Sequence, residues 1–224
     1  MRKKIIIIAL YTVFIAIISA LITTAYFHAF VLNQSEQIPQ DSLTSLSTDK
    51  VTNSIIKDGQ DIIEILSYGC HFCASNEDNV EQLEKRLPAG KKLVRLHISY
   101  DDQSGLGRYA AVFATLDVMG IEAKYRHSAY QAVNKDNIDL GDVSQLNAWL
   151  KKNNISAEEY NKTRQSAEVK QQLDYMTQIT RDYNINVTPA FIVAKKWVAI
   201  QDREFPDFAN QLLSLLNNDR PLEQ

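Results

Sequence analysis

The only two cysteines of the sequence stand three positions apart, in Cys70-His71-Phe72-Cys73. Cysteines at this spacing on the first turn of a helix can form and break a disulfide with little backbone movement, and the helix N-terminus favours a thiolate on the first one. The thiolate is the species that attacks or leaves in thiol–disulfide exchange. We predict Cys70 as the exposed nucleophile and Cys73 as the resolving thiol. His71, when protonated, would add positive charge beside the thiolate.

The same pair of cysteines has other interpretations that the residues leave open. A Cys-x-x-Cys can be half of a zinc site, but zinc takes four ligands and the four histidines of the chain show no ligand spacing. A purely structural disulfide here would close a very short loop, which removes little chain entropy. Soft thiolates also suit Cu(I), so a copper-handling or client-binding module is an alternative from another class. We predict redox exchange, with no cofactor beyond the Cys70–Cys73 disulfide.

Two further features point toward these sulfurs. Glu64 interrupts an otherwise apolar run, Ile62-Ile63-Glu64-Ile65-Leu66, and buried carboxylates are rare without a partner or a task. Glu64 either faces solvent or lies below the thiols with a raised pKa, able to exchange protons with Cys73. Thr188-Pro189 stands directly before a strand pattern. A cis proline there would leave backbone groups free to pair with an extended substrate peptide, whereas a trans proline would only end a helix.

The apolar pattern around the cysteines predicts the elements that position them. We predict a buried strand over 61–66 and a second strand over 93–98. Between them, apolar residues recur at helical spacing after Cys73 until Pro88-Ala89-Gly90 stops the helix. Cys70 therefore stands between a strand and a helix, at the helix N-terminus.

The remainder of the domain is predicted to be a long helical stretch followed by two strands and a helix. Helices are predicted over 109–119, 123–133, 143–153 and from Ser156 through Ile179. Strands are predicted at 190–193 and 197–200, joined by a hairpin and followed by an amphipathic helix over 205–216. This order is typical of an α/β domain that is interrupted by a helical insertion.

The N-terminal region carries an export signal. No charged residue occurs from Ile5 to Ser35, and Ile5–Ile22 is almost wholly apolar, which is long enough for a spanning helix. Basic residues at positions 2–4 precede this run, so the positive-inside rule places the remainder of the chain outside the cytoplasm. We predict a signal-anchor over 1–32, with a cleaved signal peptide as the alternative, and a flexible linker over 33–50.

Composition excludes several classes of protein. The net charge is −3, from 24 basic and 27 acidic residues, which gives no footprint of a nucleic-acid-binding protein. No cysteine lies outside the pair, so the chain is not a secreted scaffold held by several disulfides. With 45% hydrophobic residues, the chain can bury an ordinary globular core.

Taken together, these residues resemble the DsbA family of exported thiol–disulfide oxidoreductases. The resemblance runs from about Asp61 to Leu216, and 119 positions separate Cys70 from Pro189, which the helical insertion of that family accounts for. Four segments carry it: Ile63-Glu64-Ile65-Leu66-Ser67, Arg86-Leu87-Pro88-Ala89-Gly90-Lys91, Leu96-His97-Ile98-Ser99-Tyr100 and Val187-Thr188-Pro189-Ala190-Phe191.

The resemblance implies a thioredoxin fold with a helical insertion domain, preceded by the N-terminal transmembrane or signal helix. The first part of the thioredoxin fold would span 51–103, the insertion 104–170 and the second part 171–224. The resemblance also implies the roles of nucleophile for Cys70, resolving thiol for Cys73, proton carrier for Glu64 and substrate loop for Thr188 and the cis Pro189.

The family resemblance further implies partners and location. We expect substrates that are exported proteins with free cysteines, and reoxidation by a quinone-linked, DsbB-like membrane partner. We expect a monomer on the periplasmic side of the inner membrane. Strong oxidants of the family place Pro and then His between the cysteines, whereas His71 comes first here, and Thr188 before the proline is similar to some reductase and isomerase relatives. We predict a disulfide donor, with a reductase or isomerase of the same fold as the alternative.

Overall fold

The computed structural model describes residues 11, 14–21, 23–24 and 41–222. It divides into two compact units, Met1–Asp41 and Ser42–Gln224. Most of the predicted signal-anchor over 1–32 lies outside the described residues, and the part that is described is helical. None of the helices formed by the described residues has both the length and the apolar character needed to cross a membrane.

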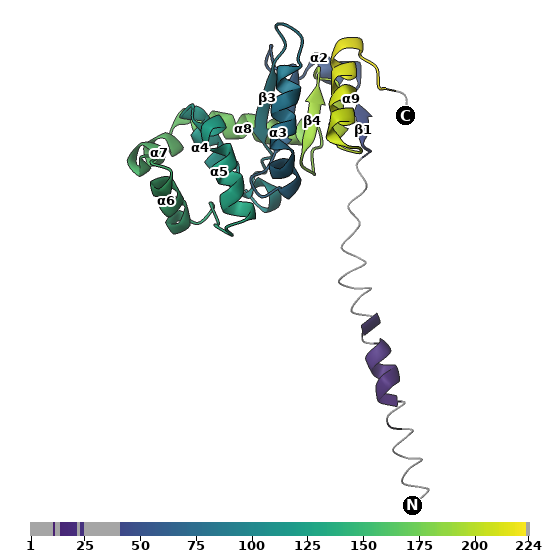
Figure 1. Cartoon of the computed structure of the whole chain (residues 1–224), viewed down its shortest axis with the longest axis vertical. Helices are drawn as coiled ribbons and strands as arrows, with labels where there is room; N and C mark the ends of the chain where they lie inside the picture. Colours follow the sequence, from purple (N-terminus) through teal and green to yellow (C-terminus); the bar gives the residue numbers. More distant parts are fainter. Residues whose placement is uncertain (1–10, 12–13, 22, 25–40, 223–224) are drawn as a thin grey trace, which may run out of the picture. The chain divides into compact units, whose positions relative to one another are not determined.

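A five-stranded mixed sheet forms the centre of the second unit (Figure 1). The strand order is β1-β5-β4-β2-β3; β2 and β3 are parallel, and the other neighbours are antiparallel. The strands are β1 Leu43–Ser45, β2 Ile62–Leu66, β3 Leu93–His97, β4 Ala190–Val193 and β5 Trp197–Ile200. The four strands predicted from the sequence, and the hairpin between the last two, are confirmed.

Helices pack on the sheet and form the insertion. Figure 1 shows α4 to α7 gathered beyond β3, the edge strand, whereas α9 lies at the opposite side beside β4. The helices are α2 Thr48–Thr52, α3 His71–Lys85, the 3₁₀-helix η3 Gly105–Tyr109, α4 Ala110–Val118, α5 Glu122–Asn134, α6 Val143–Lys152, α7 Ala157–Arg164, α8 Ala167–Asp182 and α9 Phe205–Asn218. The predicted α/β domain with a helical insertion is therefore confirmed.

The sheet separates two hydrophobic clusters. Side chains alternate between the two faces of a strand, and in β2 Ile63 and Ile65 join the cluster that includes the insertion, whereas Ile62 joins the cluster under α3 and α9. Glu64 shares the face of Ile62 by the same alternation. The centre of the sheet therefore presents a carboxylate toward the face that α3 covers.

The predicted linker over 33–50 is wrong in its C-terminal part. Residues 33–40 lie outside the described residues, but β1 pairs with β5 in antiparallel register, with Leu43 opposite Ala199, and α2 follows at once. Edge pairing of this kind depends on backbone hydrogen bonds to a distant strand, so a polar, Ser- and Thr-rich segment gives no local apolar period that would reveal it.

The long helix predicted from Ser156 is in fact two helices, α7 and α8. They separate at Gln165 and Ser166, and the Ser166 hydroxyl accepts the N–H of Val169 at 3.3 Å as the N-cap of α8. The predicted end of the insertion at residue 170 falls inside α8. The apolar spacing continues across this break, because Tyr160 of α7 and Val169 of α8 are buried in the same hydrophobic cluster. The spacing alone therefore predicted a single helix.

Candidate active site

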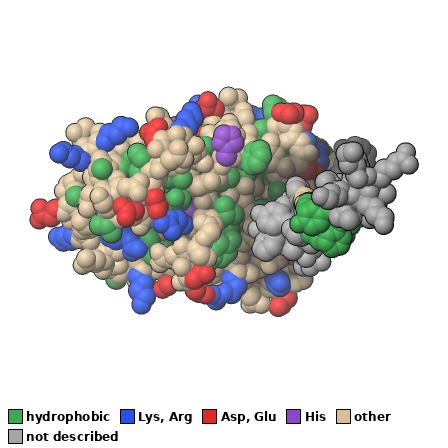
Figure 2. Space-filling view, turned by 90° about the horizontal axis from the view of Figure 1, so that it is seen from below, with side chains coloured by type: hydrophobic (Ala, Val, Ile, Leu, Met, Phe, Trp, Pro, Cys, Tyr) green, Lys and Arg blue, Asp and Glu red, His purple; other side chains and the backbone are tan. Residues whose placement is uncertain are grey.

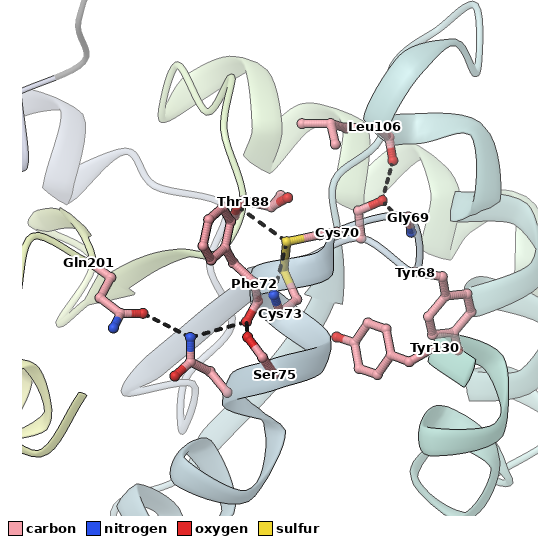
Figure 3. Close-up of a disulfide and its surroundings, with 12 residues drawn as sticks. Tyr68, Gly69, Cys70, Phe72, Cys73, Ser75, Leu106, Tyr130, Thr188 and Gln201 are labelled. Atoms are coloured by element: carbon pink, nitrogen blue, oxygen red, sulfur yellow. Dashed lines mark hydrogen bonds between the residues drawn. A yellow bond between two sulfur atoms is a disulfide. The ribbon is translucent and has the colours of Figure 1, made fainter. Parts of the chain in front are cut away.

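Cys70 and Cys73 form a disulfide at the N-terminus of α3, with their Cα atoms 5.3 Å apart (Figure 3). Cys70 is the N-cap of the helix, and its Sγ accepts the N–H of Cys73 at 3.0 Å. Cys70 is only 6% exposed, less than predicted for an exposed nucleophile, but Cys73 is fully buried. An attacking sulfur can therefore reach Cys70 alone. A thiolate at Cys70 would receive the same N–H and the field of the helix N-terminus, and both stabilise negative charge.

The loop before β4 lies against this disulfide. The Thr188–Pro189 peptide bond is cis, and the Thr188 carbonyl oxygen lies 3.3 Å from Cys70 Sγ (Figure 3). Among the described residues, the N–H groups of Val187 and Thr188 make no backbone hydrogen bond. A segment with free backbone groups beside a reactive sulfur is the arrangement needed to hold an extended peptide by strand addition.

Glu64 is fully buried in β2, so the alternative that it faces solvent is wrong. Its parallel neighbour in β3 is Arg95, and Arg95 Nε lies 2.9 Å from Glu64 Oε2. Burial raises the pKa of Glu64 to about 7, although the positive charge of Arg95 opposes this rise. The sheet face of Glu64 is covered by the buried side of α3, which carries Cys73 and Glu77. The structure therefore places a carboxyl group with a pKa near 7 under α3, the helix that begins at the Cys70–Cys73 pair.

The Glu64–Arg95 pair continues into α3 and the insertion. Arg95 Nη1 lies 2.7 Å from Glu77 Oε1, and Arg126 Nη1 of α5 lies 3.0 Å from the same oxygen. Arg126 also pairs with Glu122, one turn earlier in α5. We call these residues the buried charge network: Glu64, Arg95, Glu77, Arg126 and Glu122. It joins β2, β3 and α3 of the thioredoxin part to α5 of the insertion.

The insertion end of the network reaches back to the segment before the cysteines. The Tyr68 hydroxyl donates to Glu122 Oε1 at 3.0 Å. Burial raises the pKa of Glu122 to about 8, and the Tyr68 hydrogen bond acts in the opposite direction. Burial likewise raises the pKa of Glu77. Because the network contains three carboxyl groups and two guanidinium groups, protonation of one carboxyl makes its total charge zero.

The histidines have different surroundings. His97 is buried; its Nε2 accepts the N–H of Tyr68 at 3.0 Å, and its Nδ1 donates to the Ile98 carbonyl at 2.7 Å. Burial lowers the pKa of His97 to about 4, so the ring is neutral and fixes the backbone that leads to Cys70. His71 lies on the surface at the first position of α3, and its ring packs edge-on against that of Phe72, with centroids 6.2 Å apart. Its predicted role as a positive charge stays a prediction.

Sequence reasoning missed most of the buried charge network. Arg95 interrupts the apolar pattern of β3 as Glu64 interrupts that of β2, so two opposite charges at matching positions of neighbouring strands were the available signal. Glu122 and Arg126 gave no such signal, because a Glu and an Arg four residues apart are typical of an exposed helix face.

Three features define the class of this protein: a mixed sheet, a disulfide at a helix N-terminus and a cis-proline loop beside the first sulfur. Together they are those of a thioredoxin-fold protein with a redox-type Cys-x-x-Cys pair. The chain belongs to the DSBA-like thioredoxin domain family, whose model matches residues 74–213. The match begins one residue after Cys73, so the family assignment does not depend on the two cysteines.

Individual relatives agree with this assignment. The thiol:disulfide interchange protein DsbA of Pseudomonas syringae pv. tomato is 24% identical over 137 residues, which cover 61% of this chain and 63% of that protein. The match thus spans less than two thirds of that relative. Among solved structures, DsbA of Pseudomonas aeruginosa has a TM-score of 0.69 at 20% identity, over 80% of this chain and 92% of that one. DsbA of Proteus mirabilis with a non-covalently bound peptide has a TM-score of 0.64 at 18% identity, over 79% and 94%.

Proposed function

We propose that the chain is a thiol–disulfide oxidoreductase that donates the Cys70–Cys73 disulfide to exported proteins. The observation that carries this proposal is the asymmetry of the pair: Cys70 caps α3 and retains some exposure, whereas Cys73 is fully buried behind it. The names of the interchange proteins to which the chain is similar agree with this activity.

The exchange proceeds in two steps. A thiolate of the client attacks Cys70 Sγ, the Cys70–Cys73 bond breaks, a mixed disulfide forms with the client, and Cys73 leaves as the thiolate. A second client thiolate then attacks the client sulfur of the mixed disulfide, which forms the client disulfide and releases the Cys70 thiolate. The client loses two electrons and the cysteine pair gains two. The helix N-terminus favours the second step, because it stabilises the departing Cys70 thiolate.

Glu64 is proposed to supply a proton to Cys73 and to take it back on reoxidation. A raised pKa near 7 and a place under α3 support this role, since a carboxyl that titrates near the working pH both gives and accepts protons. His71 is proposed to add positive charge beside the Cys70 thiolate.

Thr188 and Pro189 are proposed as the loop that holds the client chain. The contact between the Thr188 carbonyl and Cys70 Sγ and the free N–H groups of Val187 and Thr188 support this role. The peptide bound to the related structure from Proteus mirabilis is in accord with a peptide site on this fold. Phe72, which is 69% exposed between the two cysteines, adds an apolar side chain at the same place.

The remaining partners and the location are proposed by analogy with the family. We propose clients with free cysteines, a quinone-linked membrane protein that reoxidises the pair, a monomeric chain and no cofactor beyond the disulfide. The charge-free run Ile5–Ile22 supports an anchor that holds the domain at the periplasmic side of the inner membrane. In Figure 2, acidic and basic side chains are interspersed on the face shown, and the net charge is −3, which favours proteins over nucleic acid as partners.

The proposal is tested by mixing the oxidised full chain in detergent with a reduced, unfolded client that has two cysteines. We expect client disulfides to form while the Cys70–Cys73 disulfide is lost in equal amount. The Cys70→Ser variant should form none. When the client is instead supplied as its disulfide, the Cys70 thiolate of reduced Cys73→Ser should attack it, release the other client sulfur as a thiolate and accumulate as the mixed disulfide, because the enzyme has no second thiol to resolve it. Binding of Cu(I) by the pair without any disulfide transfer would instead support the metal-handling alternative.

A further inference from the structure

An open cavity of about 740 Å³ lies between the loop that follows β3, the C-terminal end of α8 and the loop that precedes Thr188. Its lining includes Tyr100, Asp102 and Ser104 from the first loop, Arg181 from α8, and Asn186 from the last loop. None of these residues takes part in the exchange chemistry or in the buried charge network.

Two walls of the cavity continue directly into the active site. Asn186 stands two residues before Thr188, whose carbonyl oxygen is 3.3 Å from Cys70 Sγ, and two residues span at most about 7 Å of chain. On the other side, the loop from Ser104 enters η3, where the Leu106 carbonyl accepts the hydroxyl of Ser67 at 2.7 Å. Figure 3 shows Thr188 and Leu106 both beside Cys70. The cavity therefore lies within two residues, along the chain, of each of the two segments that reach toward Cys70.

Most of the residues that line the cavity are polar or charged, and their formal charges sum to a slightly acidic lining. Asp101 pairs with Arg181 at 2.8 Å, so these two charges compensate each other. Asp102 accepts the Ser104 hydroxyl at 2.8 Å and the Ser104 N–H at 3.1 Å. These hydrogen bonds lower the pKa of Asp102, which keeps the carboxylate charged at neutral pH. Two aspartates against one arginine leave one negative charge in the cavity.

We propose that this cavity binds the client chain beside its reacting cysteine and favours a basic or neutral polar residue there. An extended chain advances about 3.3 Å per residue, so the residue bound is about two to three positions from the client cysteine. The inference rests on the proposed function and adds a substrate preference to it. The walls supply hydroxyl and amide groups for the client backbone, and Asp102 supplies the counter-charge for a lysine or arginine.

The test uses the oxidised full chain in detergent and two reduced peptides of equal length, each with two cysteines. One peptide carries lysines at the second and third positions from the reacting cysteine, and the other carries glutamates. Reduction of the enzyme by dithiothreitol, which is too small to reach the cavity while it reacts with Cys70, measures the intrinsic reactivity of the disulfide.

We expect kcat/KM to be about 2- to 5-fold higher for the lysine peptide, the range for one exposed ion pair, and the difference to vanish in Asp102→Asn. Asn186→Trp should narrow the cavity and lower kcat/KM for both peptides about 2- to 10-fold, as one lost polar contact implies, with the dithiothreitol rate unchanged. The matched control is Asn217→Trp, at an exposed position of α9. Asn217 stands two residues before Asp219, which pairs with Lys196. Lys196 lies in the hairpin between β4 and β5, at the end of these strands opposite to Pro189.

Equal rates for the two peptides in the unmodified chain, together with unchanged peptide rates in Asn186→Trp, would overturn the inference while leaving the proposed function intact. Failure of the oxidised chain to react with either dithiothreitol or the peptides would overturn the proposed function and this inference together. If Asn186→Trp does not fold, the peptide comparison in the unmodified chain and in Asp102→Asn still decides.

Discussion

Glu64 and Arg95 occupy matching positions of the parallel strands β2 and β3, and their side chains meet in the core with Oε2 and Nε 2.9 Å apart. Charges removed from water cost several kcal/mol each unless partners compensate them. Arg95 compensates Glu64 only in part, since the pKa of Glu64 is still raised to about 7. The centre of the sheet therefore holds a carboxyl that can bind a proton under physiological conditions.

The first prediction concerns the pH dependence of stability. The pKa of Glu64 is about 7 in the folded chain against a usual value of 4.5, so between these values the folded chain holds a proton that the unfolded chain has lost. Its contribution to stability is full below pH 4.5 and is lost as the pH rises through 7. Glu64→Gln should remove this loss, which is about 3 kcal/mol at most.

The measurement is the free energy of unfolding in urea at pH 5 and pH 8 for both proteins. The free energy of unfolding of Glu64→Gln minus that of the unmodified chain should be larger at pH 8 than at pH 5. The matched control is Glu158→Gln, an exposed position of α7. A pH dependence that is the same in the unmodified chain and in Glu64→Gln would show that Glu64 stays ionised throughout.

The second prediction concerns the link between the insertion and the thioredoxin part. Arg126→Met should lower the free energy of unfolding by about 3–5 kcal/mol at pH 7, because Glu77 and Glu122 both lose a buried counter-charge. Adding Glu122→Gln should recover part of this loss, since the second carboxylate is then neutral.

Denaturant unfolding of the two single variants and the double variant gives the coupling energy. Arg181→Met is the control: Arg181 is 59% exposed in its pair with Asp101, and such pairs contribute about 0–1 kcal/mol. Equal losses for Arg126→Met and Arg181→Met would contradict a buried charge network.

The third prediction tests the contact between the segment before the cysteines and the insertion. Tyr68→Phe removes the hydroxyl that donates to Glu122 and should cost about 1–3 kcal/mol in thermal or urea unfolding. Tyr130→Phe removes a buried hydroxyl that has no hydrogen-bond partner among the described residues, so it should change stability little. A larger loss for Tyr130→Phe than for Tyr68→Phe would refute this assignment of contacts.

The elements that position the site were predictable because each has a local signal. The apolar runs of β2 and β3, the stop at Pro88-Ala89-Gly90 and the hairpin before β5 all match the structure. β1 was not predictable in the same way, because it is a three-residue strand that depends on pairing with β5, more than 150 residues later, and on the packing of Leu43 against a distant cluster. The break between α7 and α8 depends on a single N-cap, Ser166.

The residues of the site also divide into those that the sequence reveals and those that only the fold reveals. The cysteines, Glu64 and the Thr188–Pro189 loop could be found from residue type and spacing. Glu77 and Arg126 could not, because the three-dimensional packing of α3 against α5 turns two ordinary helix charges into buried ones. The role of His97 was not predictable from the sequence either, because only the fold shows that its ring accepts the Tyr68 N–H.

The direction of exchange is the central claim, and the reduction potential of the Cys70–Cys73 pair tests it most directly. The full chain in detergent is equilibrated with glutathione buffers, and the fraction of disulfide is determined after thiols are trapped with alkylating reagent. A disulfide donor requires a potential near that of strong oxidants, about −120 mV, because a stabilised Cys70 thiolate makes the disulfide easy to reduce. A potential near that of thioredoxin, about −270 mV, would contradict the account and identify a reductase.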